Sequence, residues 1–448
     1  MISISRSWLL SLRQLASYSQ NDSDINKKIN FILFERQLFN YDETTLILDI
    51  YKELHKNSVE VVCLSAYIWN REILELVAEK IKKFNKDILI IWGGPEFITD
   101  LPNQKEHLYD AISYGVDGEE SFLNFFKKYL NGTHRETLGF AFYSDVEGKF
   151  VKNSVCPAKI KVDWLYESYI RFPLDYDHYD PNGSCELDYE IMRGCDQYCS
   201  FCTWYLHKKF TKDPERCAYE LNHLISSIPK NFRERLHIDF TDSISDSDLH
   251  IQTVMKIDRS FQGYIAILLS ESPNYDILKL IDNYKISVDV GIQSLNDSSL
   301  RYLKRNPHDL PKTYQLIDNL NKTKLHLGNI HLMLGLPRHN YDDHMKELDF
   351  FQNKIGWRMY CSILSILPGT ALKKTVDKDN YVYSKKAPYQ IIETPDFSKE
   401  EVIKLKNIVD NHYHHTSSLF ESVSSFQEYV DHNKKNPYTF NTNPLLRK

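Results

Sequence analysis

Three cysteines in one short stretch constrain this chain more than any other feature. They are Cys195, Cys199 and Cys202, in the run Met-Arg-Gly-Cys-Asp-Gln-Tyr-Cys-Ser-Phe-Cys that begins at Met192. Thiolates with CxxxCxxC spacing lie on one loop, where they can hold three irons of a four-iron four-sulfur cluster and leave the fourth iron open to a ligand. A four-cysteine zinc site normally shows two CxxC pairs, and a redox dithiol shows one. The spacing therefore favours the cluster over zinc, a dithiol or three cysteines buried for packing.

This loop resembles the cysteine loop of the radical S-adenosylmethionine (SAM) superfamily. In that family the open iron binds the amino and carboxylate groups of SAM, and an electron from the cluster splits the sulfonium to give a 5′-deoxyadenosyl radical. The resemblance implies two cofactors, SAM and a [4Fe-4S] cluster held by the three cysteines. It also implies that Phe201 packs against the adenine, and that a flavodoxin or ferredoxin donates electrons.

Length and composition indicate a globular protein with more than one domain. A chain of 448 residues is too long for one ordinary core. The net charge of -6, with both signs mixed, gives no basic stripe for nucleic acid. No apolar run reaches about 18 residues, and the N-terminus lacks a signal-peptide core, so we expect a cytoplasmic protein without a membrane partner. The eight cysteines show no pairing pattern of a secreted scaffold.

The first region, residues 1–134, alternates apolar strands with amphipathic helices. We expect strands at 60–66, 88–92 and 111–114 and a helix at 71–83. Glycines follow the last two strands, in Gly-Gly-Pro-Glu from Gly93 and in Gly-Val-Asp-Gly-Glu-Glu from Gly115. This pattern predicts a parallel sheet with ligand-facing loops. The region resembles the cobalamin-binding-like, Rossmann-like domain that precedes the radical core in many SAM enzymes.

The start of this region departs from cobalamin-binding domains. We expect the first helix to begin near Ser7, which leaves no room for a complete first strand. The cobalamin-ligand motif Asp-x-His-x-x-Gly is also absent from the sequence. We therefore expect a Rossmann-like scaffold that serves packing or holds a substrate. Cobalamin binding stays open as the second interpretation.

The remaining chain is predicted to form a connector at 135–183 with a hairpin, a partial (β/α)6 barrel at 184–375, and a small helical C-terminal extension at 376–448. The expected barrel strands are 187–192, 236–240, 264–270, 287–294, 325–335 and 359–367. In such barrels the chemistry lies at the carboxyl ends of the strands. The extension has one expected helix, 398–413. Its end carries His412, His414 and His415, which we interpret as solvated in preference to metal-binding.

Several strand ends resemble SAM-binding segments of the family. The second strand ends in carboxylates where the family often shows Gly-Gly-Glu, which contacts the SAM amino group. The fourth strand and the segment after it resemble the part that meets the SAM ribose and carboxylate, and Gly-Leu-Pro resembles the motif beside adenine. With Phe201, the expected SAM-binding residues are Asp239, Thr241, Asp242, Glu271, Gln293, Ser294, Arg305, Gly335 and Leu336.

The choice of reaction depends on Cys361, which lies in the expected sixth strand. Alternation along that strand would point its thiol into the barrel, where it could give a hydrogen atom to a carbon radical. With this cysteine the chain resembles radical SAM peptide epimerases of proteusin-type peptides. That resemblance implies L-to-D epimerisation at Cα of a precursor peptide with leader and core, with Cys361 as hydrogen donor. A buried core cysteine is an equally good interpretation.

Two other functions compete with epimerisation. A cobalamin-dependent C-methyltransferase acting on a peptide or natural product would carry a corrinoid in the first region. A non-catalytic binding protein would require the three cluster cysteines to be vestigial.

Overall fold

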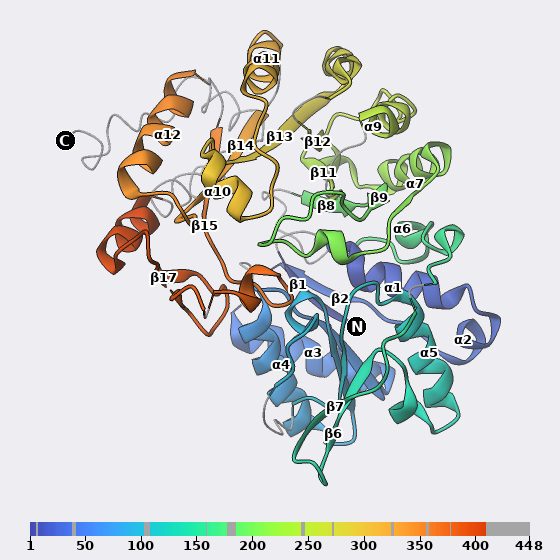
Figure 1. The fold of residues 1–448 in the computed structure, drawn as a ribbon. Coiled ribbons are helices and arrows are strands. Elements are labelled where there is room, and N and C mark those ends of the chain that lie inside the picture. Colours follow the sequence, from blue (N-terminus) through green and yellow to red (C-terminus); the bar gives the residue numbers. More distant parts are fainter. Residues whose placement is uncertain are drawn as a thin grey trace. The chain divides into compact units, whose positions relative to one another are not determined.

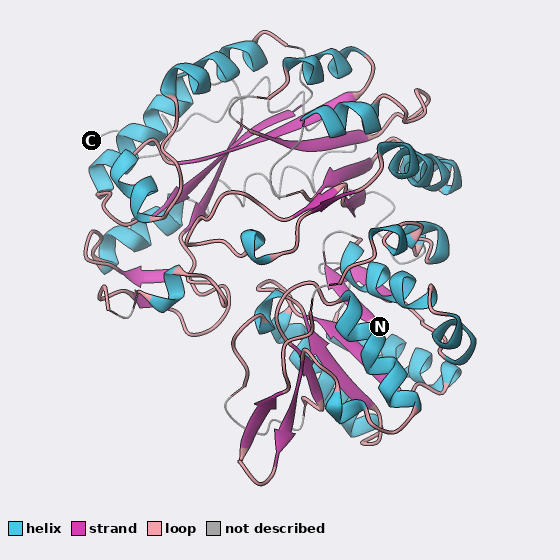
Figure 2. Cartoon of the chain, turned by 45° about the vertical axis from the view of Figure 1, so that its right-hand side comes forward, coloured by secondary structure: helices cyan, strands magenta, loops and turns pink. Residues whose placement is uncertain are grey.

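The structure is a computed structural model. It describes residues 1–5, 8–37, 42–102, 108–157, 159–176, 185–242, 247–270, 273–323, 327–354, 358–376 and 378–408. The chain divides into two compact units, the first made of residues 1–180 and 206–210 and the second of residues 181–205 and 211–448. Figure 1 traces the chain through both units, and Figure 2 shows their helices and strands.

The first unit is built on a seven-stranded sheet in the order β2-β1-β3-β4-β5-β6-β7. Its strands are β1 (Ile2–Ser5), β2 (Phe34–Gln37), β3 (Val61–Ser65), β4 (Leu89–Gly93), β5 (Ala111–Ser113), β6 (Phe140–Ser144) and β7 (Lys149–Lys152). Its α-helices are α1 (Leu10–Gln20), α2 (Ser23–Lys28), α3 (Glu43–Asn57), α4 (Arg71–Phe84), α5 (Glu119–Leu130) and α6 (Ser168–Arg171). Strands β1 to β5 pair in parallel, and β6 and β7 add an antiparallel hairpin.

Helices cover both faces of this sheet. Val62 and Leu64 of β3 pack with α3 and α4, whereas Cys63 between them packs with α1 and α5. Because side chains alternate along a strand, a strand buried on both faces has a continuous apolar run. This doubly wound arrangement agrees with the predicted Rossmann-like fold.

The N-terminal start of the first unit differs from the prediction. Residues Ile2–Ser5 form β1, which pairs in parallel with β2 and β3, and α1 begins only at Leu10. The expectation that the first helix begins near Ser7 and leaves no room for a complete first strand is therefore wrong, because the helix begins later and β1 precedes it. Four residues carry too weak a pattern to identify a strand without its two neighbours. The hairpin of the predicted connector also belongs to this sheet, because β6 pairs with β5.

The second unit is built on a six-stranded parallel sheet in the order β15-β14-β13-β12-β11-β8. The strands are β8 (Cys185–Tyr189), β11 (Leu236–Phe240), β12 (Tyr264–Leu269), β13 (Lys285–Gln293), β14 (Leu327–Leu334) and β15 (Arg358–Ile363). The α-helices are α7 (Pro214–Ser227), α8 (Lys230–Arg233), α9 (Ser247–Val254), α10 (Asp297–Tyr302), α11 (Leu310–Asn321) and α12 (Tyr341–Lys354). This sheet is the predicted half-barrel. Every expected strand is present with ends shifted by a few residues.

Local sequence signals explain where the longer helices of this unit begin. Asp213 caps α7 by accepting a hydrogen bond from the Arg216 amide, and Pro214 occupies the first helical turn. Asp309 caps α11 in the same way, again with a proline in the first turn. A carboxylate before the helix satisfies a free amide, and proline lacks the amide that would need a partner there.

The two faces of the half-barrel sheet differ in character. On one face, apolar side chains pack under the helices, and the Tyr189 hydroxyl donates to Glu220 of α7 at 2.9 Å. The other face carries ionisable and polar side chains, and we call it the polar face. Its members are Glu186, Asp188, His237, Asp239, Asp289, Asn329, His331 and Tyr360.

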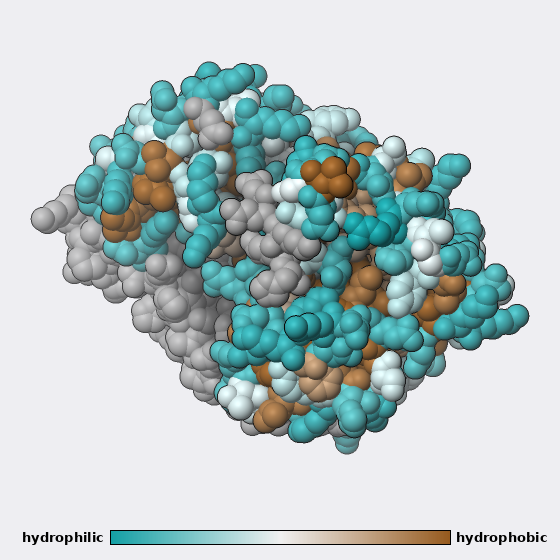
Figure 3. Space-filling model, turned by 90° about the horizontal axis from the view of Figure 1, so that it is seen from below, coloured by the Kyte–Doolittle hydropathy of each residue, from teal (hydrophilic) through white to brown (hydrophobic). Residues whose placement is uncertain are grey.

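After the barrel, β16 (Val382–Tyr383) and β17 (Ile391–Glu393) form a small antiparallel pair, and residues 399–408 are helical. The rest of the predicted C-terminal helix, with His412, His414 and His415, lies outside the described residues. Among the described helices, each is too short or too polar to cross a bilayer. The face in Figure 3 is mainly hydrophilic, with separate apolar groups.

Candidate functional site

The three predicted cluster cysteines lie on the loop after β9 (Met192–Arg193), and none of them forms a disulfide. Backbone amides approach their sulfur atoms: the Gln197 amide lies 3.3 Å from the Sγ of Cys195, and the Trp204 amide lies 3.4 Å from the Sγ of Cys202. Amides that donate to sulfur stabilise the thiolate form, which is the form that binds iron. The backbone of this loop therefore prepares its sulfur atoms for a metal.

Contacts from distant segments hold the loop. The Ser200 amide donates to the Leu303 carbonyl and the Leu372 amide donates to the Ser200 carbonyl, each at 2.7 Å. The Lys212 amide donates to the Ile191 carbonyl at 2.8 Å, which ties the two ends of the segment together. The loop is thus held by backbone bonds to the segments after β13 and β15.

Burial raises the pKa of two of the three thiols, those of Cys199 and Cys202. Burial raises the pKa of Cys202 to about 11, and the neighbouring Cys199 and Cys195 charges add to the shift. Burial also raises the pKa of Cys199, although the Arg305 guanidinium opposes the shift. The three thiols lie on one loop with the spacing of a shared iron cluster. Loading that cluster must displace their protons.

Arg305, predicted to bind SAM, lies beside the cysteine loop. Its guanidinium donates to the Gly291 carbonyl at the end of β13, and its Nη1 is 3.9 Å from the Sγ of Cys199. The structure therefore brings the predicted SAM segment of β13 to the predicted cluster ligands.

The other predicted residues at the end of β13 differ in accessibility. Gln293 has a positive φ of 69°, at a shift of strand register, and is half-buried. The side chain of Gln293 lies beside Gly291. A Cβ added at Gly291 would be only 3.2 Å from the Gln293 Nε2. Ser294 is completely buried and donates to Glu347 of α12 at 3.1 Å. Gln293 is therefore within reach of a ligand, and the Ser294 hydroxyl is engaged inside the protein.

The predicted adenine motif after β14 is also buried. Gly335 has φ 77°, and its amide donates to the Nε2 of His344 at 3.1 Å. A Cβ at this glycine would lie 2.3 Å from Ile391, and Leu336 is completely buried. Gly335 and Leu336 are therefore part of the packed interior of the turn after β14. Phe201, in the cysteine loop, is half-buried.

Two of the predicted SAM-binding residues follow the end of β11. Asp242 is buried, and its Oδ1 accepts the Ile191 and Met192 amides at 3.0 Å, just before the cysteine loop. Its Oδ2 lies 2.9 Å from the Nε2 of His250. This buried carboxylate therefore bonds the backbone that leads into the cysteine loop through its Oδ1, and its predicted contact with the SAM amino group stays a prediction. Thr241 is likewise engaged, because its amide donates to the Tyr189 carbonyl.

Asp239 lies on the polar face, and its carboxylate is accessible to solvent. Desolvation by the surrounding protein, with the charges of Asp289 and Asp188, raises its pKa well above the ordinary value. Of the carboxylates predicted at the end of β11, Asp239 is the more exposed one. The predicted residue Glu271 lies outside the described residues.

The polar face carries a cluster that was not predicted from the sequence. Asp289 accepts from Asn329 at 2.8 Å and pairs with His331 at 2.7 Å, and the His331 ring lies against Tyr360. Desolvation pushes the pKa of Asp289 up, but its bonds with His331 and Asn329 outweigh this effect and lower it. The sequence signal was present: polar residues two apart inside apolar strands share one face.

The structure overturns the predicted direction of Cys361. This thiol is in register with Leu332 of β14, and both residues are 1% exposed on the face that packs under the helices. Its neighbour Tyr360 pairs with His331 on the polar face. Burial raises the pKa of Cys361 to about 12. The expectation that this thiol points into the barrel is therefore wrong.

Residues 189–351 match the family model described as the Radical SAM superfamily. None of the curated proteins matches the chain.

Two solved structures share its fold. One is the radical SAM methyltransferase TsrM from Kitasatospora setae with tryptophan substrate and a SAM analogue bound, at 14% identity over 86% of this chain and 77% of that one, with a TM-score of 0.66. The other is the cobalamin-dependent SAM radical enzyme OxsB with aqua-cobalamin and SAM bound, at 15% identity over 97% and 71%, with a TM-score of 0.65. At these identities the likeness concerns the fold. The family match indicates a radical SAM domain at residues 189–351, and such a domain implies a [4Fe-4S] cluster and SAM as cofactors.

Proposed function

We propose that the chain is a radical SAM enzyme that uses both units and transfers a methyl group to a peptide or another natural product. Cys195, Cys199 and Cys202 would hold the cluster, whose open iron would bind the amino and carboxylate groups of SAM. When reduced, the cluster supplies the electron that splits the SAM sulfonium. The reaction also needs an external reductant, and a flavodoxin or ferredoxin suits that role.

One observation carries the choice of methyl transfer. The likeness to TsrM and OxsB covers 86% and 97% of this chain, so it includes the first unit as well as the radical SAM domain. TsrM is a methyltransferase, and OxsB is a cobalamin-dependent enzyme. The strand β1 also removes one of the two sequence-based reasons for doubting a corrinoid in the first unit, and the absence of the Asp-x-His-x-x-Gly motif is the other.

The carboxyl end of the first unit's sheet has residues suited to a flat ring. Trp69 follows β3, is half exposed, and stacks on Tyr67 with ring centroids 4.6 Å apart. Gly115 follows β5, and no atom lies within 4 Å of the position that a Cβ would occupy there. In open α/β sheets, ligands bind at the carboxyl ends of the strands. Tyr67 and Trp69 are the residues that we would expect to hold a corrinoid, packed against its apolar surface.

Peptide epimerisation is the second candidate. It needs a hydrogen donor near the substrate radical, and Cys361 lies on the helix-covered face. Epimerisation would therefore require a different donor. Because no such donor has been identified, we rank epimerisation below methyl transfer.

The cluster assignment is tested by replacing Cys195, Cys199 and Cys202 together by Ala. We expect the anaerobically reconstituted variant to lose both the iron–sulfur absorbance and reductive SAM cleavage, because no thiolate ligand remains. Cys156→Ala, at a half-buried cysteine outside the loop, is the control and should retain both. Formation of 5′-deoxyadenosine by the triple variant would contradict the assignment.

Methyl transfer is tested by corrinoid retention. Protein supplied with hydroxocobalamin should keep stoichiometric corrinoid absorbance through gel filtration, and Trp69→Ala should weaken that binding about tenfold, since base-sized aromatic contacts are worth about 1–3 kcal/mol. The product should be heavier by a methyl group. Loss of corrinoid from the wild type, with one solvent deuterium at each modified Cα, would instead support epimerisation.

A further inference from the structure

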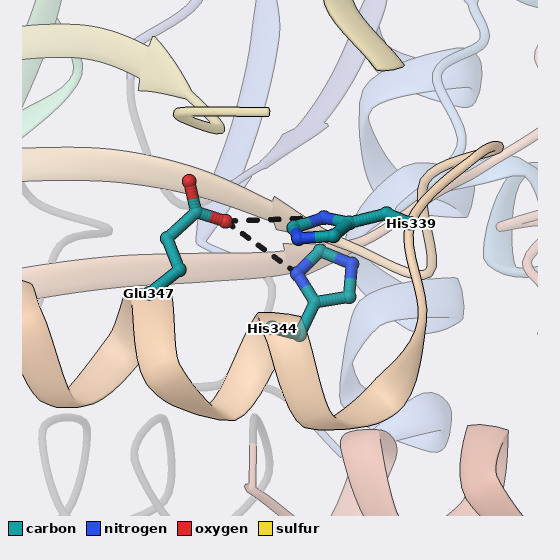
Figure 4. A group of neighbouring side chains, drawn as sticks. All are labelled: His339, His344 and Glu347. Carbon is teal, nitrogen blue, oxygen red and sulfur yellow. Dashed lines mark ion pairs between the residues drawn. The ribbon is translucent and has the colours of Figure 1, made fainter. Parts of the chain in front are cut away.

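Helix α12 presents two buried ionisable side chains to the ends of β13 and β14. His344 and Glu347 are three residues apart, so they lie on the same side of the helix, and His339 approaches them from the preceding loop (Figure 4). Each of the three side chains is more than nine-tenths buried. Buried ionisable groups are costly unless they are bonded, so their partners indicate what they do.

Glu347 holds the end of β13. One carboxylate oxygen accepts the Leu295 amide, and the other accepts the Ser294 hydroxyl at 3.1 Å. The Ser294 oxygen in turn accepts the Asn296 amide at 3.0 Å. A single carboxylate therefore organises three successive residues immediately after Gln293.

His344 holds the end of β14. Its Nε2 accepts the Gly335 amide at 3.1 Å, so the neutral ring carries its proton on Nδ1. The Nδ1 of His344 faces the Oε2 of Glu347 at a distance of 3.6 Å. The imidazole thus accepts the Gly335 amide and lies beside the carboxylate that organises β13, without a hydrogen bond to it.

The same three side chains could be read as a metal site. Their ligand atoms lie within 4.8 Å of one another, and two histidines with one carboxylate are a known ligand set. A metal on the Nδ1 of His344 would need a free electron pair there and would move the proton to Nε2. The Gly335 amide already points its own hydrogen at Nε2, so two N–H groups would face each other. The hydrogen bond from Gly335 therefore argues against a metal.

His339 completes the cluster as a neutral neighbour. Its ring centroid is 3.8 Å from that of His344, and its Nδ1 is 4.0 Å from Glu347. Desolvation and the adjacent His344 lower the pKa of His339 to about 4. The ring is therefore uncharged at neutral pH, and it covers the carboxylate with no competing positive charge.

We propose that Glu347 and His344 are positioning residues for SAM, which together hold the carboxyl ends of β13 and β14 in one fixed arrangement. This assignment rests on the proposed radical SAM function. The two strand ends are those that resemble the ribose and carboxylate segment and the adenine segment. Both are bonded to one helix face, so they keep their relative placement when SAM binds.

The test compares SAM binding by Glu347→Ala, Glu347→Gln and the wild type, each anaerobically reconstituted as the full chain. SAM binding is followed by the change it causes in the electron paramagnetic resonance spectrum of the reduced cluster, which needs no turnover. Glu347→Ala should raise the Kd for SAM at least about tenfold, since it leaves buried donors unpaired. Glu347→Gln keeps an acceptor for the Leu295 amide and should fall between the two.

Asp343→Asn on the same helix is the matched control, because the Asp343 carboxylate is partly exposed and bonds Asn340 and Lys346 instead of the strand ends. This variant should bind SAM like the wild type. If the Glu347 variants fail to fold, Ser294→Ala is the variant to test in their place, because it removes one hydrogen bond to Glu347. Wild-type affinity in a folded Glu347→Ala variant would overturn the positioning role alone. A wild type whose cluster never responds to SAM would contradict the radical SAM function itself. Stoichiometric zinc that is lost in His344→Ala would replace this assignment by a metal site.

Discussion

A shift of one residue along β15 decides which side of the sheet a side chain occupies. Tyr360 reaches His331 on the polar face, and Cys361 packs beside Leu332 under the helices. A thiol on the helix-covered face is a small apolar residue, and a hydrogen donor needs the opposite face. The register of β15 against β14 therefore decides that Cys361 serves packing and that Tyr360 can face a ligand.

Cys361→Ala tests that conclusion directly. The variant should form 5′-deoxyadenosine and turn over substrate at the wild-type rate, and it should lose about 1 kcal/mol of unfolding free energy from a small cavity. Urea unfolding and product analysis give the two readouts. Cys217→Ala, at another fully buried thiol, should behave in the same way. A Cys361 variant that cleaves SAM but makes no product would restore the thiol as hydrogen donor.

At the scale of elements, the ends of the barrel strands are built by groups that lie far away in the sequence. Asp242 holds the backbone before the cysteine loop, Glu347 holds the end of β13, and His344 holds the end of β14. Each is a buried side chain that bonds backbone amides of another segment. Loops that must keep a fixed shape need such partners, since they have no ladder of their own.

Gly335 is the element-scale position where substitution should cost most. Gly335→Ala would place an alanine at a positive φ, which costs about 1–2 kcal/mol of unfolding free energy. The new Cβ would also clash with Ile391, whose side chain would have to move. Gly148→Ala has a similar φ of 66° with no atom within 4 Å, so it should lose only the backbone part. Unfolding free energies in urea measure both. Ile391→Ala should recover part of the loss at Gly335, and equal losses at the two glycines would contradict the predicted clash.

At the scale of the whole molecule, two units with separate cores share one chain. The first unit has helices on both faces of its sheet, and the second has helices on one face and polar groups on the other. The chain returns to the first unit at 206–210, shortly after Cys202, where the Lys208 amide donates to Asp117 at 2.7 Å. The likeness to TsrM and OxsB extends over this whole architecture at 14–15% identity. Apolar patterning, which many sequences satisfy, is enough to preserve such a fold.

The sequence by itself determined the features that depend on neighbouring residues. The cysteine loop is recognised because its three ligands lie within eight positions of the chain. Apart from β1 and β2, the strands of both sheets are recognised because apolar runs end at glycines and polar residues. The order of elements then restricts the sheets to parallel forms with ligand-facing carboxyl ends.

Only the tertiary structure decided the features that depend on distant partners. Alternation along β15 predicts two faces but not which of them packs under helices, and pairing with β14 settles this for Cys361. The four residues of β1 become a strand because β2 and β3 lie on either side. Asp242 and Glu347 resemble any other acidic residue in the sequence, and their roles come from amides about 50 residues away. Long-range hydrogen bonds and burial are set by the whole fold, which no local pattern encodes.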